Sequence, residues 1–131
     1  MLLPFFGMPF LATAASLQDV PVVRGPSLVA RGDLTRFRAK GFPLDTAVSV
    51  QLVPAVNWGG NCCGIVVVKR TAVTDVGTAT LRFQWPRGFY RCSGSRCNLY
   101  AWTPGQRVVV SVSTINSRGV PVEAHTSARI R

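Results

Sequence analysis

Residues 34–40 read LTRFRAK and residues 78–85 read TATLRFQW. In both stretches an apolar side chain is followed by a polar or basic one, with a period of two residues. Successive side chains of a β-strand point to opposite faces, so this alternation is typical of a strand with one buried and one solvated face. The two stretches therefore predict two half-buried strands.

The same alternation recurs through the rest of the chain, and no amphipathic helix of ten or more residues is visible. It is found again in residues 48–52, 108–113 and 122–130. Short turn sequences rich in Gly, Pro, Asn and Asp separate these runs, at residues 31–33, 41–43, 75–77, 103–105 and 116–119. This pattern predicts an all-β fold, an immunoglobulin-like two-sheet antiparallel sandwich of about seven strands over residues 20–131.

The chain carries 15 Lys and Arg against 5 Asp and Glu, a net charge of +10. In an immunoglobulin-like sandwich the second and fifth strands are neighbours, so four basic side chains are expected on one outer face: Arg36, Arg38, Lys40 and Arg82. We call these four residues the basic stripe. The other sheet is expected to show uncharged side chains to solvent: Ser49, Gln51, Ser111 and Ser113. Such an excess of charge favours anionic partners, although it also serves solubility.

The first residues indicate export. Residues 2–15 are apolar and end in Ala12-Thr13-Ala14, small residues of the kind that signal peptidase accepts. The first basic residue is Arg24, so the usual positive segment is missing, and residues 1–15 are interpreted as a signal peptide or as an apolar N-terminal segment. No run is long enough to span a membrane. A secreted or cell-surface location is expected.

Four cysteines in a small exported chain indicate disulfides before metal ligands. Cys92 and Cys97 enclose Ser-Gly-Ser-Arg, turn residues that allow two antiparallel segments to face each other, so these two are expected to pair. Cys62 and Cys63 pair either with each other or with partners in the other loop. Three connectivities are possible, and the sequence does not choose among them.

Aromatic side chains gather near these cysteines, in residues 54–64 and 86–106, which are expected to be loops. The candidate ligand-binding residues are Trp58, Trp85, Phe89, Tyr90, Asn98, Tyr100 and Trp102. Trp85 and Trp102 also suit the sandwich core, whereas Phe89 and Tyr90 are consecutive and cannot both point inward. A concave apolar site with a few polar groups is one hypothesis, and stacking on single-stranded nucleic acid is a weaker one.

Catalysis is not expected. Glu123, His125 and Ser127 share one face of the last predicted strand, but their backbones are about 7 Å apart at each step, and no oxyanion hole or nucleophile turn accompanies them. The acids are scattered singly, so they offer no carboxylate pair. Arg31-Gly32-Asp33 spells an adhesive tripeptide, yet Gly and Asp are expected in a turn for backbone reasons. The chain is therefore predicted to be no enzyme and to hold neither metal nor cofactor.

Several stretches together resemble a known family. These are the run from Gly32 through Pro43, the strand Val48-Ser49-Val50, residues 74–79, and a loop whose two cysteines have four residues between them. They are similar to the neocarzinostatin family of actinobacterial enediyne-carrying apoproteins. Residues 104–119 are also similar to the final hairpin of fibronectin type III domains.

The first resemblance implies a seven-stranded sandwich with a cleft beside the disulfides, holding a hydrophobic antibiotic chromophore that attacks DNA. Cys92 and Cys97 match the short bridge of that family. Cys63 falls near one cysteine of its other bridge, but Val53 stands where the partner should be. Those carriers are typically acidic, whereas this chain is basic.

Three functions follow from the sequence. The first is a secreted, non-enzymatic carrier of a small hydrophobic ligand. The second is a basic module that binds nucleic acid or an anionic cell-wall polymer, with DNA-binding or antimicrobial consequences. The third is a structural or adhesion domain of an exported assembly, and the oligomeric state is left open.

Overall fold

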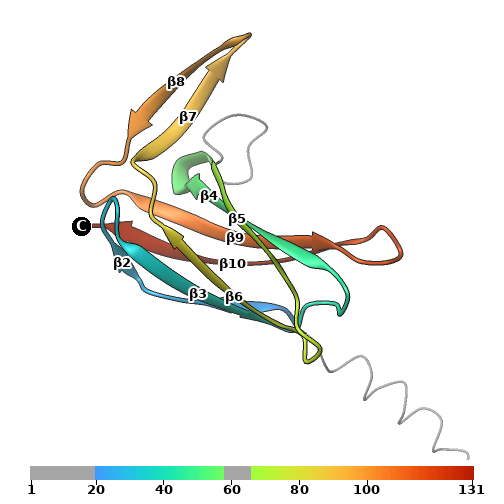
Figure 1. Ribbon diagram of the computed structural model, residues 1–131. Helices are drawn as coiled ribbons and strands as arrows, with labels where there is room; N and C mark the ends of the chain where they lie inside the picture. Colours follow the sequence, from blue (N-terminus) through green and yellow to red (C-terminus); the bar gives the residue numbers. More distant parts are fainter. Residues whose placement is uncertain (1–19, 58–65) are drawn as a thin grey trace, which may run out of the picture.

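The computed structural model describes residues 20–57 and 66–131, which form a sandwich of two β-sheets with a separate hairpin at one end (Figure 1). The smaller sheet has the order β1-β3-β6 and the larger one the order β2-β10-β9-β4-β5. The strands of the smaller sheet are β1 (Val22–Arg24), β3 (Leu34–Lys40) and β6 (Thr78–Gln84). Those of the larger sheet are β2 (Leu28–Val29), β4 (Ala47–Pro54), β5 (Val66–Ala72), β9 (Arg107–Ile115) and β10 (Pro121–Ile130).

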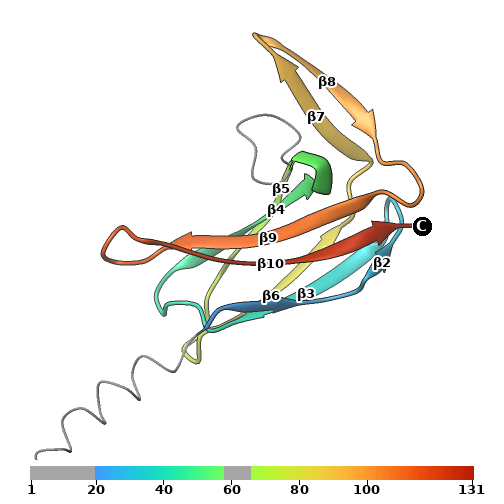
Figure 2. The same ribbon diagram turned by 180° about the vertical axis from the view of Figure 1, so that it is seen from behind.

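Three further elements lie at one end of the sandwich. A short 3-10 helix, η1 (Ala55–Asn57), follows β4, and β7 (Gly88–Ser93) pairs with β8 (Arg96–Ala101) in the hairpin. Viewed from either side, the hairpin projects beyond the two sheets, whereas the β9–β10 turn lies at the opposite end (Figures 1 and 2). The predicted all-β sandwich is confirmed. The described chain has more strands than the seven expected, because β1 and β2 are very short and residues 88–101 form a hairpin instead of a loop.

The core lies between the sheets and follows the alternation of the sequence. In β3, Thr35, Phe37 and Ala39 are buried while the residues between them are exposed, and β6 buries Ala79, Leu81 and Phe83 in the same way. The larger sheet contributes mainly valines from its inner face, among them Val48, Val50, Val108, Val110 and Val112. Antiparallel pairing of β3 with β6 places equivalent side chains opposite each other, so the two alternating stretches present one common apolar face.

Phe37 is the central ring of this core. Its side chain is fully buried and stacks on Phe83, with 5.9 Å between ring centroids. Gly25 lies so close to the Phe37 ring that a Cβ at this position would collide with it. The glycine thus lets the segment after β1 pass directly over the aromatic ring, which closes the core at the edge of the smaller sheet.

The outer face of the larger sheet differs from expectation at one position. Ser111 was expected to face solvent, but only 1% of its surface is exposed. Ser111 lies in the middle of the sheet, between Gln51 on β4 and His125 on β10, and its hydroxyl donates a hydrogen bond to the Glu123 carboxylate at 2.7 Å. The longer neighbouring side chains and this hydrogen bond cover the small hydroxyl.

Asp33 joins the β2–β3 turn to the end of the chain. Its carboxylate accepts a hydrogen bond from the Ala30 backbone N–H at 2.9 Å and pairs with the Arg131 guanidinium at 2.8 Å. The Ala30 N–H, followed by the Arg131 side chain, lowers the pKa of Asp33 from its ordinary value. The carboxylate of the Arg31-Gly32-Asp33 tripeptide is therefore engaged within the fold, as a turn residue would be.

No helix in the described part of the chain is long and apolar enough to cross a membrane. Residues 1–15, interpreted as a signal peptide or apolar segment, lie outside the described residues, as do Trp58, Cys62 and Cys63.

The central role of Phe37 predicts the effect of its removal. Phe37→Ala should lower the free energy of unfolding by about 3–5 kcal/mol, because it deletes a fully buried ring and leaves a cavity. Denaturant unfolding followed by tryptophan fluorescence measures this loss. Leu34→Ala on the same strand is the control, since Leu34 is 79% exposed. An equal loss in both variants would contradict the assigned inner and outer faces.

The lowered pKa of Asp33 predicts a pH dependence. A carboxyl group whose pKa is depressed by folding stabilises the native state above its unfolded pKa, here 3.8, and the contribution is lost as pH falls through the folded pKa. Thermal unfolding of the native chain from neutral pH down to pH about 2 should therefore show a loss of stability that Asp33→Asn reduces. The contribution is modest because the pair is solvent-accessible. Identical pH profiles for the two proteins would contradict this role.

Candidate functional site

The hairpin of β7 and β8 is covalently closed near its tip. Cys92 and Cys97 occupy directly paired positions, with 4.0 Å between their Cα atoms, and form a disulfide. The pairing predicted from the sequence is confirmed. A two-stranded hairpin is only marginally stable in water by itself, so the disulfide compensates for the small apolar area that these strands bury.

At the base of the hairpin, the backbones of the two strands are in close contact. A Cβ on Gly88 would collide with the backbone carbonyl of Tyr100 on the facing strand. Beyond this pair, the Trp102 backbone N–H donates to the Arg87 carbonyl at 3.2 Å, which continues the pairing towards the sandwich. The hairpin is thereby held to the chain that leaves β6.

A continuous series of aromatic rings links this hairpin to the core. Trp85 follows β6 and stacks near Phe83, with 6.1 Å between ring centroids, and Trp102 follows β8 at 6.3 Å from Trp85. Phe89 on β7 lies 4.8 Å from Trp102 and 5.9 Å from Tyr100 on β8. We call the rings of Phe83, Trp85, Trp102, Phe89 and Tyr100 the aromatic series. It runs from the buried interior to solvent.

The outer end of the series forms one face of the hairpin. Phe89 pairs with Tyr100 and Arg91 pairs with Asn98, so the strand register puts these four side chains on the same side. The Arg91 guanidinium lies 5.5 Å from the centre of the Tyr100 ring, within the range of a cation–π interaction. We call Phe89, Arg91, Asn98 and Tyr100 the aromatic face. Tyr90 and Leu99 pair on the opposite side.

Burial divides the candidate ligand-binding residues into two groups. Trp85 and Trp102 are 1% and 3% exposed and belong to the core, which was the alternative interpretation of these two rings. Phe89 is buried against Trp102, whereas Tyr90 and Tyr100 are 52% and 44% exposed. The consecutive Phe89 and Tyr90 do point to opposite sides, as the sequence indicated. Trp58 lies outside the described residues.

Both core tryptophans bury an unpaired donor. The indole Nε1 atoms of Trp85 and Trp102 are inaccessible to solvent, and neither finds an acceptor within the part of the chain that the structure describes. An unsatisfied buried N–H costs about 1–3 kcal/mol, so such a group calls for an explanation. One of these two donors belongs to Trp102, whose ring packs against Phe89.

A second group of predicted residues also comes together. Arg36 on β3 is directly opposite Arg82 on β6, and Arg38 and Lys40 follow along β3 towards Thr80 and Thr78. The basic stripe therefore occupies one outer face of the smaller sheet, as the strand order predicted. The structure adds Arg24, which β1 places opposite Arg38. A strand of three residues carries too little alternation to be recognised from sequence.

Neither a metal centre nor a catalytic arrangement emerges among the described residues. Their His, Cys, Asp and Glu side chains form no group of three or more that could hold a metal ion. Glu123, His125 and Ser127 do share the exposed face of β10, but the Glu123 carboxylate accepts its hydrogen bond from Ser111 on the neighbouring strand.

No protein-family model matches this sequence, and no curated protein does. Solved structures with a similar fold exist. A superoxide reductase (neelaredoxin) from Ignicoccus hospitalis is 11% identical, with a TM-score of 0.57, and the alignment covers 92% of this chain and 87% of that one. Macromomycin, of the neocarzinostatin family, is 14% identical with a TM-score of 0.57, covering 85% of this chain and 99% of its own. The resemblance to the neocarzinostatin family is thus confirmed as a likeness of fold.

The hairpin geometry predicts a local effect of the disulfide. Replacing both Cys92 and Cys97 by Ser should raise amide hydrogen exchange in β7 and β8 while leaving exchange in β3, β4 and β9 unchanged, because the hairpin lies beyond the two sheets. Hydrogen exchange read by mass spectrometry measures both regions in one experiment. Protection that is lost equally in the sandwich strands would show that the hairpin is not an independent unit.

Proposed function

We propose that this chain is an exported, non-enzymatic carrier that binds a small hydrophobic molecule on the aromatic face of the β7–β8 hairpin. The observation that carries the proposal is the aromatic series itself. It places a half-exposed Tyr100 ring beside the buried Phe89 and Trp102 rings, on an element that projects from the sandwich (Figure 1). A flat apolar ligand stacked on these rings would extend the core outward by one further layer.

The exposure of the hairpin supports a binding role over a purely structural one. Every residue of β8 is exposed, and Leu99 and both tyrosines of the hairpin keep about half of their surface in solvent. Aromatic residues with a polar end are typical of binding surfaces, because they offer a large contact area with few rotatable bonds.

Polar groups beside the rings supply the means to orient a ligand. The Arg91 guanidinium and the Asn98 side chain lie on the same face as Tyr100. The indole N–H of Trp102 is a buried donor without an acceptor among the described residues, and a ligand carbonyl or ether oxygen would satisfy it once the neighbouring rings part slightly. The ligand expected from this set is an aromatic molecule with one or two acceptor oxygens.

The fold is similar to that of macromomycin, which agrees with a carrier function. It is also similar to that of a superoxide reductase, so the same fold can also support an enzyme. We favour the carrier because the described residues gather aromatic rings and not metal ligands at the projecting end. The disulfide in the hairpin agrees with export into an oxidising compartment.

Binding is tested with a neutral apolar fluorophore, N-phenyl-1-naphthylamine, whose emission rises in an apolar environment. Tyr100→Ala should weaken binding about tenfold, because an aromatic pair contributes about 0.5–1.5 kcal/mol beyond the area it buries and 1.4 kcal/mol corresponds to a factor of ten. Tyr90→Ala is the matched control, since Tyr90 has a similar exposure on the opposite side of the same hairpin. Equal weakening by the two substitutions, or no binding by the native chain, would contradict the proposal.

Native mass spectrometry of the protein recovered from culture medium tests export and carriage together. We expect a mass that lacks residues 1–15 and a fraction of the protein with a retained small molecule. A mass that includes Met1, found only inside cells and without a ligand, would contradict both parts.

A further inference from the structure

The outer face of the smaller sheet carries five cations and no anion. The basic stripe contributes four of them and Arg24 the fifth, and we call this set the basic face. The three strands that bear it, all of them described in full, contain no Asp or Glu. The ion pair between Arg131 and Asp33 lies outside these strands. Glu123 on β10 lines a pocket together with Arg24, but within residues 20–57 and 66–131 no ion pair involves any of the five cations.

The register makes this arrangement costly. Arg24 is paired with Arg38, and Arg36 with Arg82, so two pairs of like charges stand directly opposite each other across neighbouring strands. Like charges in this position destabilise a sheet. A solvated surface would avoid the cost by alternating the signs of its charges, whereas an anionic partner would remove it by lying between the cations.

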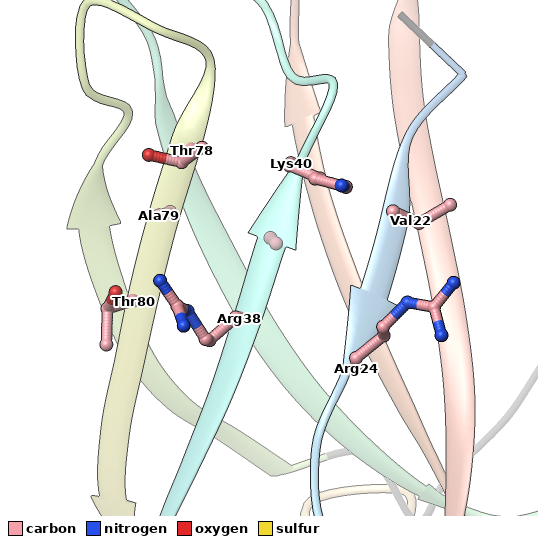
Figure 3. A pocket seen from close by; sticks show the side chains of 8 residues that line it. Val22, Arg24, Arg38, Lys40, Thr78, Ala79 and Thr80 are labelled. Carbon is pink, nitrogen blue, oxygen red and sulfur yellow. The ribbon is translucent and has the colours of Figure 1, made fainter.

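Three of the five cations, Arg24, Arg38 and Lys40, line a shallow groove and do not converge on one point. The groove has a volume of about 340 Å³ and lies over β1, β3 and β6. Figure 3 shows the Arg38 guanidinium beside Thr80 on β6, while the Arg24 guanidinium points the other way, beyond β1. Lys40 extends from β3 towards Val22. A single phosphate ion needs donors that converge on it, and these donors diverge.

The spacing of the cations fits a repeating anion. Neighbouring strands of a sheet are about 4.8 Å apart, and alternate residues of one strand are about 7 Å apart, so the basic face is a grid of positive charges with these two intervals. A flexible chain with one negative charge in each repeat can follow such a grid along Arg36, Arg38 and Lys40. The exposed Thr80 hydroxyl adds a neutral donor at its side.

We propose that the basic face binds a flexible linear polymer of phosphate groups, and that it recognises the phosphates alone. The outward positions of β1, β3 and β6 hold no aromatic side chain on which a nucleic-acid base could stack. This face belongs to the smaller sheet, and the aromatic face belongs to the hairpin. The polymer site is therefore independent of the proposed carrier function.

Isothermal titration calorimetry of the full chain with inorganic polyphosphate tests the proposal. The logarithm of the binding constant should fall linearly with the logarithm of salt concentration, with a slope of about −3.5 if the five cations each release a counterion at about 0.7 per phosphate. The variant R36Q/R38Q/R82Q should bind at least about tenfold more weakly and reduce the slope by about 2. R36K/R38K/R82K should keep most of the affinity, because lysine also neutralises a phosphate.

The matched control is R87Q/R107Q/R118Q, which removes the same charge from three exposed arginines outside the smaller sheet. This control should change the affinity less than about twofold, and circular dichroism checks that all variants keep the native fold. Equal losses in the two glutamine variants would overturn the proposal, since net charge alone would then explain binding. Tighter binding of single-stranded DNA than of polyphosphate at equal phosphate concentration would also overturn it, as would the absence of binding at low salt.

Discussion

The stacking of Phe37 on Phe83 between the two sheets is the contact on which the remaining structure depends. Phe37 on β3 and Phe83 on β6 lie on the inner face of the same sheet, and Gly25 leaves room for the Phe37 ring beneath the segment after β1. Once these rings point inward, the period of two residues forces the arginines between them outward. The same contact starts the aromatic series, because Phe83 is followed two residues later by Trp85, which continues it towards the hairpin. This one contact therefore positions both the basic face and the aromatic face.

Much of this fold could be predicted from sequence, because strands with one buried face carry the strongest pattern. The alternation in residues 34–40 and 78–85 identified two paired strands, and it placed Arg36, Arg38, Lys40 and Arg82 on a common outer face. The Cys92–Cys97 disulfide followed from its turn residues. These features depend on neighbours along the chain or on one well-defined pairing.

The remaining features depend on contacts that leave no such pattern. Residues 86–106 were expected to form a loop, since β8 is exposed at every position and so lacks the apolar alternation of a sandwich strand. Ser111 was assigned to solvent because the covering role of Gln51, Glu123 and His125 depends on the pairing of three strands. Arg24 was missed because β1 has only three residues. In each case, the environment of the residue is determined by the pairing of strands that are distant from one another in the sequence.

The two proposed surfaces have opposite physical characters. On the aromatic face, binding would be governed by apolar contact and should respond little to ionic strength, whereas binding to the basic face would be governed by charge and should weaken steeply with salt. The chain shares its fold with macromomycin, and its net charge of +10 is the property on which the basic face depends. A carrier held at an anionic polymer by its sheet, with the hairpin left accessible, would combine the two.

The central claim is that the aromatic face of the hairpin is the ligand site, and the most direct measurement is a two-dimensional nitrogen–proton NMR titration of the native chain with a neutral aromatic ligand that carries a carbonyl oxygen. The account predicts that the largest shifts occur at the indole N–H of Trp102 and at the amides of Phe89, Arg91, Asn98 and Tyr100, with little change in β3 and β6. Shifts concentrated in the smaller sheet, or an unmoved Trp102 indole signal at saturation, would contradict it.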